Sequence, residues 1–469
     1  MFLPNPAFRL LCGLVAAVSA TFLNAQGSVD DYMIGVQLDK AAFEDRPLEE
    51  MFAEMRDLAG INAVFYFFAE SDINLGEDFD SETPFALEPG EVNAEGQDLI
   101  DRMIESAAKY GIDVYLGGGE MFWGNVLPRF PKAAEIDYES ERRKTPCVNR
   151  PEWREFQMAV HAEIFRQKPK LAGFLLMHER TGPMMKVFKP EYWQGSYNPG
   201  CFCEHCLEIA ENRGIDADDA REGFAKLVEL YSDEDSELRR DGVMIGMWRI
   251  VSEHPEVMAW EHFQWGSLHD YRAEFAETIR AVDPEDKVGY HFQHAGLTGD
   301  FPWRAGDRPD APTEYADFVK PSIYPGVSGS RYKALVDISR ETWLADLDEE
   351  TAHAVLSQWF GRSPREGEDV FGKYAPEHVA FGPQWCRTET ARYVKGAAPL
   401  PVYAGLGIGV PGGEEAEGIE LIRECTEACI EGGADGFILS RHYSEMRPEL
   451  LQAAAEVIHR HRAELANGE

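Results

Sequence analysis

The sequence predicts a (β/α)8 barrel, a closed sheet of eight parallel strands surrounded by helices. Short apolar segments alternate with longer amphipathic segments along the chain, which favours parallel pairing of the strands. Eight such apolar segments can be distinguished, and the extra length of the chain falls after strands, in the insertions 121–150, 181–253 and 325–372. A doubly wound open sheet is the alternative, but no Gly-rich phosphate-binding loop follows the first strand.

The expected strands are short runs of apolar and aromatic residues, which suit a sheet that is buried on both faces. The second strand, with the sequence Ala-Val-Phe-Tyr-Phe-Phe, is a clear example. The sixth strand contains Pro321, which has no N–H to donate to a neighbour, so we expect that strand to be short. In chain order the expected strands are 33–38, 63–68, 113–116, 171–177, 288–292, 318–323, 400–405 and 436–440.

The segments between these strands include longer amphipathic stretches, as expected for helices that cover the outside of a barrel. The longest of them precedes the fifth strand, and another closes the chain. In chain order the expected helices are 48–58, 97–109, 153–165, 256–282, 418–431 and 448–463.

The charge of the chain excludes two classes of partner. Its 83 acidic and 45 basic residues give a formal net charge of −38. Such a surface repels nucleic acids and anionic membranes at long range, so we expect neither as a partner. A solvated acidic surface that promotes solubility is the simplest explanation of the charge.

The N-terminal residues 1–25 have the pattern of a secretory signal peptide. Arg9 is followed by an apolar run that ends at Val18, and the small residues Ala20 and Ala25 are candidate cleavage positions. The run is too short to span a bilayer, and no transmembrane segment is predicted after it. We therefore expect an exported protein, periplasmic or extracellular, whose single barrel domain covers residues 28–469.

Seven cysteines remain after the signal peptide, and an odd number argues against a framework made of disulfides alone. Cys201, Cys203 and Cys206 form a Cys-x-Cys-x-x-Cys motif in the insertion after the fourth strand. Cys147 lies in the neighbouring insertion, after the third strand. Four thiolates at this spacing predict a closed, structural zinc site. Disulfides are the alternative, and His205 is an alternative ligand.

The same region resembles a known family. Cys147-Val148-Asn149 follows the third strand, His178-Glu179 ends the fourth, and the cysteine motif comes after it. This order resembles that of the zinc-bearing β-galactosidases of glycoside hydrolase clan A over roughly residues 110–210. The resemblance implies a (β/α)8 barrel, zinc held by the four cysteines, and Glu179 as the general acid/base. His178 stands where that family has asparagine.

The second carboxylate that glycoside hydrolysis usually needs is less clear. The family's nucleophilic Glu ends strand seven, but residues 403–409 contain no carboxylate. Glu120 is our candidate, because it follows the third strand, next to the fourth. A carboxylate facing water is the alternative for Glu120, and a buried ion pair with His178 or Arg180 is the alternative for Glu179. Further acidic residues near strand ends are Glu70, Asp72 and Glu445.

Other polar and aromatic residues near the carboxyl ends of strands are candidates for binding a sugar, because they can donate hydrogen bonds to hydroxyl groups or stack on a ring. These candidates are His178, His291, His294, Tyr324, Arg441, His442 and Trp123.

We therefore expect an exported glycoside hydrolase that acts on a poly- or oligosaccharide through carboxylate acid/base catalysis. Two alternatives remain open. One is a non-catalytic carbohydrate-binding barrel that lacks the nucleophile, and the other is a metal-dependent hydrolase that uses the histidines. The sequence predicts no oligomeric state.

Overall fold

The predicted barrel is confirmed. In a computed structural model, eight strands form a closed barrel in the order β1, β10, β9, β8, β7, β6, β3, β2, and every neighbouring pair is parallel. The strands are β1 Met33–Leu38, β2 Ala63–Phe67, β3 Asp113–Gly118, β6 Gly173–Leu176, β7 Lys287–Phe292, β8 Phe318–Ile323, β9 Tyr403–Leu406 and β10 Gly436–His442. The structure describes residues 32–75, 91–118, 127–128, 130–177, 182–188, 200–293, 301–359, 381–409 and 418–467.

Helices cover the outside of the barrel, and the six predicted ones are confirmed to within a few residues at each end. They are α2 Leu48–Ala59, α3 Leu99–Ala108, α5 Pro151–Gln167, α10 Glu256–Val282, α16 Ile419–Glu431 and α17 Pro448–Asn467. Among the described residues, no helix has the length and apolar character needed to cross a membrane.

The seventh barrel strand begins later than the sequence predicts. Residues 400–405 were expected to form it, but β9 runs from Tyr403 to Leu406. Pro401 has no N–H to donate, although its carbonyl accepts a hydrogen bond from Val319 N at 3.0 Å. Ladder pairing of β9 therefore begins beyond Pro401.

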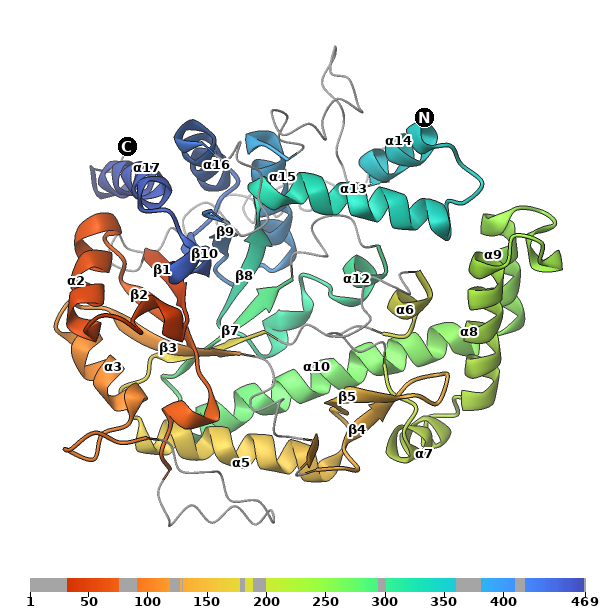
Figure 1. Ribbon diagram of the computed structural model, residues 1–469, viewed down its shortest axis with the longest axis horizontal. Helices are drawn as coiled ribbons and strands as arrows, with labels where there is room; N and C mark the ends of the chain where they lie inside the picture. The colour runs from red at the N-terminus through yellow and green to blue at the C-terminus, as the bar shows by residue number, and fades with distance from the viewer. Residues whose placement is uncertain are drawn as a thin grey trace, which may run out of the picture.

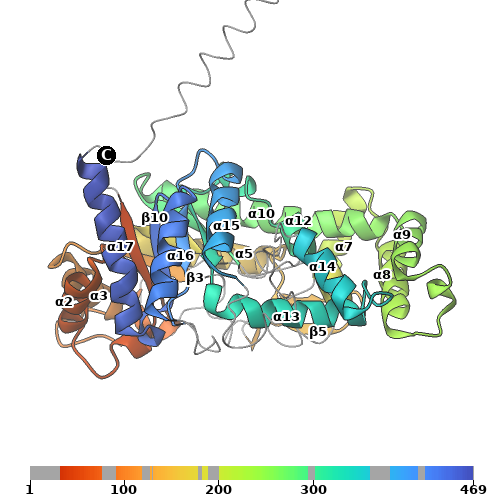
Figure 2. The same cartoon turned by 90° about the horizontal axis from the view of Figure 1, so that it is seen from above.

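The insertions contain elements that the sequence did not reveal. Figures 1 and 2 show that several of them extend to one side of the barrel along α10, so that the molecule is elongated. They are the antiparallel hairpin β4 Ala134–Ile136 and β5 Arg142–Pro146, with α6 Met184–Phe188, α7 Glu204–Asn212, α8 Ala217–Ser232 and α9 Val243–Glu253. The described residues also form the α-helices α12 Phe301–Gly306, α13 Pro325–Glu341, α14 Glu349–Trp359 and α15 Pro383–Gly396.

The interior of the barrel contains an apolar cluster toward the amino ends of the strands. Phe65 of β2 stacks on Tyr115 of β3 with ring centroids 4.7 Å apart, and Phe318 of β8 meets both rings edge-on. Ala63, Leu175 and Ile438 complete the cluster. Two positions further along β8 and β10 come the polar residues Lys320 and Ser440, nearer the carboxyl ends of the strands, where barrels of this kind build their sites.

The close approach of β6 to β7 gives a test of this fold. Gly173 has a φ of +148°, and a Cβ added there would lie 1.8 Å from the carbonyl oxygen of Lys287. We expect Gly173→Ala to lower the free energy of unfolding by about 3 kcal/mol or more, because both the backbone and the strand pairing must distort. Urea denaturation measures the change.

Gly266→Ala on α10 is the matched control, because its added methyl group meets nothing within 4 Å. That variant should be as stable as the wild type or more stable by about 1 kcal/mol. Equal stability of Gly173→Ala and the wild type would contradict the β6–β7 register.

Candidate functional site

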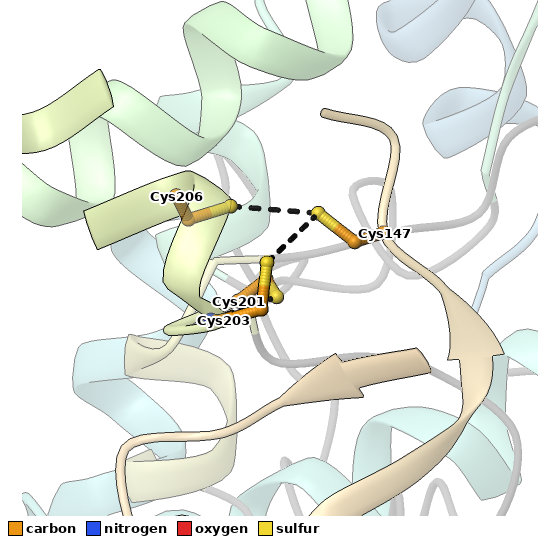
Figure 3. Close-up of side chains that lie close together, drawn as sticks. All are labelled: Cys147, Cys201, Cys203 and Cys206. Atoms are coloured by element: carbon orange, nitrogen blue, oxygen red, sulfur yellow. Dashed lines mark hydrogen bonds between the residues drawn. The ribbon is translucent and has the colours of Figure 1, made fainter. Parts of the chain in front are cut away.

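The four cysteines of the predicted metal site lie together in a fully buried cluster, which we call the thiol cluster (Figure 3). The sulfur of Cys147 is 3.4 Å from that of Cys206 and 3.9 Å from that of Cys203. All four sulfur atoms, including that of Cys201, lie within 4.8 Å of one another. None of the seven cysteines in the described residues forms a disulfide. The cluster can therefore bind a metal ion.

Two insertions bring the thiols together. Strand β5 ends at Pro146 and delivers Cys147, whose backbone N–H donates to the carbonyl of Ala133 at 2.6 Å. On the other side, Cys203 caps the N-terminus of α7 and Cys206 lies in its first turn. Phe202 stacks on Trp260 of α10, with ring centroids 3.9 Å apart. The cluster therefore joins the insertion after β3 to the insertion after β6.

N–H groups donate to the sulfur atoms of Cys147, Cys201 and Cys206. Cys201 Sγ accepts from the backbone of Ile136 at 3.4 Å and of Cys203 at 3.3 Å. Asn149 donates twice, from its backbone to Cys147 and from Nδ2 to Cys206 at 3.3 Å. Hydrogen bonds with Cys147 and the other two thiols lower the pKa of the Cys203 thiol, whereas hydrogen bonds raise the pKa of Cys147 and burial raises that of Cys201. Cys203 is therefore the thiol of these three that ionises most readily.

The carboxyl end of the barrel holds a buried polar network that the sequence analysis missed. The side-chain oxygen of Gln37, on β1, accepts hydrogen bonds from Lys320 Nζ at 2.8 Å and from the Ser440 hydroxyl at 2.7 Å. Its Nε2 lies 3.9 Å from the sulfur of Met177, just after β6. Lys320 and Ser440 are fully buried. Lys320 therefore brings a positive charge into the barrel mouth, between the apolar residues Val319 and Pro321 of β8.

Two of the predicted sugar-binding residues lie beside this network. His291 of β7 is in register with Lys320 of β8, and both side chains are buried. The Ser322 hydroxyl lies 3.3 Å from His291 Nε2 and donates to the Tyr324 hydroxyl at 3.3 Å. Lys320 Nζ is 5.9 Å from the centre of the Tyr324 ring. The structure therefore brings His291 and Tyr324 together at the mouth through Ser322.

His442 and Arg441, at the end of β10, lie on the same rim. The ring of Phe67 meets the imidazole of His442 edge-on at 5.3 Å. Glu445 accepts from the backbone N–H of His442 at 3.2 Å and pairs with Arg441 at 3.5 Å. Burial lowers the pKa of His442, and the positive charges of Arg441 and Lys320 lower it further, against Asp39 and Glu445. A neutral imidazole at neutral pH can both donate and accept a hydrogen bond.

The other acidic residues near strand ends have structural partners. Asp72 accepts hydrogen bonds from the Tyr66 hydroxyl and the backbone of Ala69, both at 2.8 Å, and pairs with Lys40 at 3.1 Å. Glu445 holds the turn after β10 in the same way. These contacts argue against either carboxylate as a nucleophile. Several sequence-predicted site residues lie outside the described residues, namely Glu120, Trp123, His178, Glu179 and His294.

Within the described part of the chain, two groups of side chains can hold a metal ion. One is the thiol cluster, and the other is Asp137, Glu139 and Glu141. The second group is already paired with Lys186 and Arg143. His291 and His442 belong to neither group, so the described residues give no support to a metal-dependent hydrolase that uses these histidines.

Solved structures with the same fold include two β-galactosidases. The chain has 16% identity and a TM-score of 0.54 to a polyextremophilic β-galactosidase from the Antarctic haloarchaeon Halorubrum lacusprofundi, covering 90% of this chain and 57% of that one. It has 15% identity and a TM-score of 0.56 to a β-galactosidase from the psychrophilic Marinomonas ef1, covering 93% and 60%. The chain thus spans about three fifths of the length of these proteins. No family model and no curated protein matches it.

The barrel-mouth charges give a prediction about His442. Replacing Lys320 by methionine removes a buried positive charge and keeps most of the side-chain volume. We expect Lys320→Met to raise the pKa of His442 toward its ordinary value, because one repulsive charge is lost. An NMR titration of the imidazole protons, assigned with a His442→Gln variant, measures this pKa.

Lys287→Met is the control, since Lys287 lies at the amino end of β7 and is exposed. It should leave the pKa of His442 unchanged. A pKa that also stays unchanged in Lys320→Met would show that Lys320 does not face the rim.

Proposed function

We propose that this protein is an exported glycoside hydrolase that cleaves a poly- or oligosaccharide at the carboxyl end of its barrel. The observation that carries the proposal is the buried polar network of Gln37, Lys320 and Ser440, placed above an apolar cluster in the barrel interior. A buried network of donors and acceptors suits a ligand rich in hydroxyl groups. The likeness in fold to two β-galactosidases supports the same reaction class.

Glu179 is the proposed general acid. In the sequence it comes three residues after Leu176, where β6 ends, and residues that follow the carboxyl ends of barrel strands build the sites of such folds. The acid protonates the leaving oxygen as the glycosidic bond breaks. Glu120 is the proposed second carboxylate, because it follows β3, which pairs with β6.

The described residues of the mouth have binding roles in this proposal. His291 and Tyr324 hydrogen-bond with sugar hydroxyls, and neutral His442 donates or accepts at the rim. Lys320 stabilises negative charge, which favours an ionised second carboxylate.

We also propose that the metal of the thiol cluster is zinc with a structural role. Zinc–sulfur bonds of about 2.3 Å in a tetrahedron place sulfur atoms about 3.8 Å apart. The separations of 3.4 Å and 3.9 Å fit that geometry. Four cysteine ligands close the coordination shell, so zinc there would stabilise the fold and take no part in the reaction.

Export follows from the N-terminal pattern of residues 1–25. N-terminal sequencing of the protein recovered outside the cytoplasm should begin after Ala20 or Ala25. Recovery with Met1 intact would contradict this part of the proposal.

Hydrolysis of a glycan panel tests the catalytic assignment. Glu179→Gln should lower kcat by about 10²- to 10⁴-fold, because the general acid is lost, and should leave glycan affinity largely intact. Calorimetry with wild type and variant follows binding in parallel. Glu204→Gln is the control, because Glu204 lies exposed in the same insertion and pairs with Arg150.

Two results would oppose the assignment in different ways. A wild-type protein that binds a glycan and never cleaves it is a carbohydrate-binding barrel. A Glu179→Gln variant with the full rate places the chemistry on other residues.

Elemental analysis tests the metal. We expect one zinc per chain in the wild type and none in Cys203→Ser, together with a loss of unfolding free energy on the order of 4 kcal/mol. Cys425→Ser is the control, because Cys425 is equally buried but lies on α16, away from the thiol cluster. It should retain zinc. Zinc-free wild type with disulfides among the four cysteines would refute the site.

A further inference from the structure

Helix α10 carries a stripe of three buried polar residues, Glu261, Gln264 and Ser267, spaced three residues apart on one face. Two of them hold the thiol cluster. Gln264 accepts from the backbone N–H of Cys201 at 3.1 Å and donates to its carbonyl at 3.0 Å. Ser267 accepts from the side chain of Asn149 at 3.0 Å. These two residues therefore fasten the cluster to α10.

The third residue of the stripe, Glu261, holds a different part of the chain. Its Oε2 accepts from the backbone N–H of Met184, the first residue of α6, at 3.0 Å. Its Oε1 accepts from the indole N–H of Trp265 at 2.9 Å. The carboxylate packs against Gly182, where an added Cβ would lie 2.1 Å from Oε1. Only glycine at position 182 allows this approach without movement.

Two parts of the insertion after β6, at residues 182–184 and at residue 201, are therefore fastened to α10 within one helical turn. Glu261 holds residues 182–184, and Gln264 holds residue 201. In the sequence, Glu179 comes only three residues before Gly182. A contact this close to a catalytic group limits where that group can lie, and small displacements of catalytic groups have large effects on rate.

We propose that Glu261 is a positioning residue for the reaction, which sets the place of the segment that carries Glu179 by anchoring Gly182 and Met184 to α10. This inference rests on the proposed function. The inference goes beyond the proposed function, because it assigns a role to a residue that lies on a helix outside the barrel and does not touch the substrate.

The chemistry of Glu261 makes this anchor dependent on pH. Burial raises the pKa of Glu261 to about 7, although the hydrogen bonds from Met184 and Trp265 lower it. The ionised carboxylate accepts from both N–H groups, whereas a protonated carboxyl presents one oxygen as a donor and loses an acceptor. The anchor is therefore complete above about pH 7 and weakened below it.

The charged groups around Glu261 are already engaged with one another. Glu261 lines a cavity of about 680 Å³ between α6, α9, α10 and α12. Four other lining residues form two pairs. Arg308 pairs with Asp310, and His269 of α10 pairs with Glu314 at 2.9 Å. His262, also on α10, is the remaining titratable group of the lining, and the cavity residues from α6 and α9 are uncharged.

Kinetics of Glu261→Gln test the inference. The amide cannot accept at both atoms, so we expect kcat to fall about 10- to 100-fold with KM within about twofold. The acid-side decrease of kcat near pH 7 should disappear in the variant, because glutamine does not titrate, and zinc content should stay unchanged. Glu277→Gln is the matched control, since Glu277 is exposed on the same helix. It should match the wild type.

Hydrogen–deuterium exchange followed by mass spectrometry gives a second measurement that needs no substrate. At pH 8, Glu261→Gln should speed exchange in residues 182–188 and leave residues 173–177 of β6 protected. Gly182→Ala perturbs the same contact from the other side, and it replaces Glu261→Gln if that variant fails to fold. Both variants should give the same pattern.

The outcomes separate this inference from the proposed function. Faster exchange with an unchanged kcat overturns the positioning role, and unchanged exchange overturns the anchor itself. If the wild type hydrolyses no glycan, the proposed function is refuted, and the positioning role is refuted with it. Faster hydrogen–deuterium exchange in Glu261→Gln would then still support the anchor.

Discussion

The convergence of four buried thiols is the interaction on which the architecture around the barrel depends. Long insertions follow β3 and β6, and the thiol cluster lies where the two meet. The thiol cluster fixes Cys147 of one insertion against Cys201, Cys203 and Cys206 of the other. Asn149 then connects the cluster to Ser267, and Phe202 packs on Trp260. The thiol cluster thus attaches two insertions to α10.

The interior of the barrel has an apolar half and a polar half. Aromatic rings of β2, β3 and β8 pack together in the amino half. Polar residues lie in the carboxyl half, where Lys320 is buried and donates a hydrogen bond to Gln37. Burying a lysine opposes folding unless its charge is well compensated, so its retention here favours a functional role. The network is therefore the feature of the described residues that supports the proposed ligand site at the mouth.

Much of this could be predicted from the sequence, and the reasons are local. Apolar runs such as Val64–Tyr66 indicated each barrel strand, and the cysteine spacing indicated the thiol cluster. Gln37, Lys320 and Ser440 were missed, because they come from β1, β8 and β10 and only closure of the barrel joins them. The role of Glu261 was hidden in the same way, since its partners at 182–184 are fixed by tertiary packing. The hairpin β4–β5 lacked a clear alternating pattern.

The central claim is that the carboxyl end of the barrel binds carbohydrate, and a crystal structure with a bound oligosaccharide tests it most directly. The account predicts a sugar ring at the mouth, within hydrogen-bonding distance of His291, Tyr324 or Lys320 and next to Glu179. A sugar bound only elsewhere, with the mouth filled by ordered water, would contradict it.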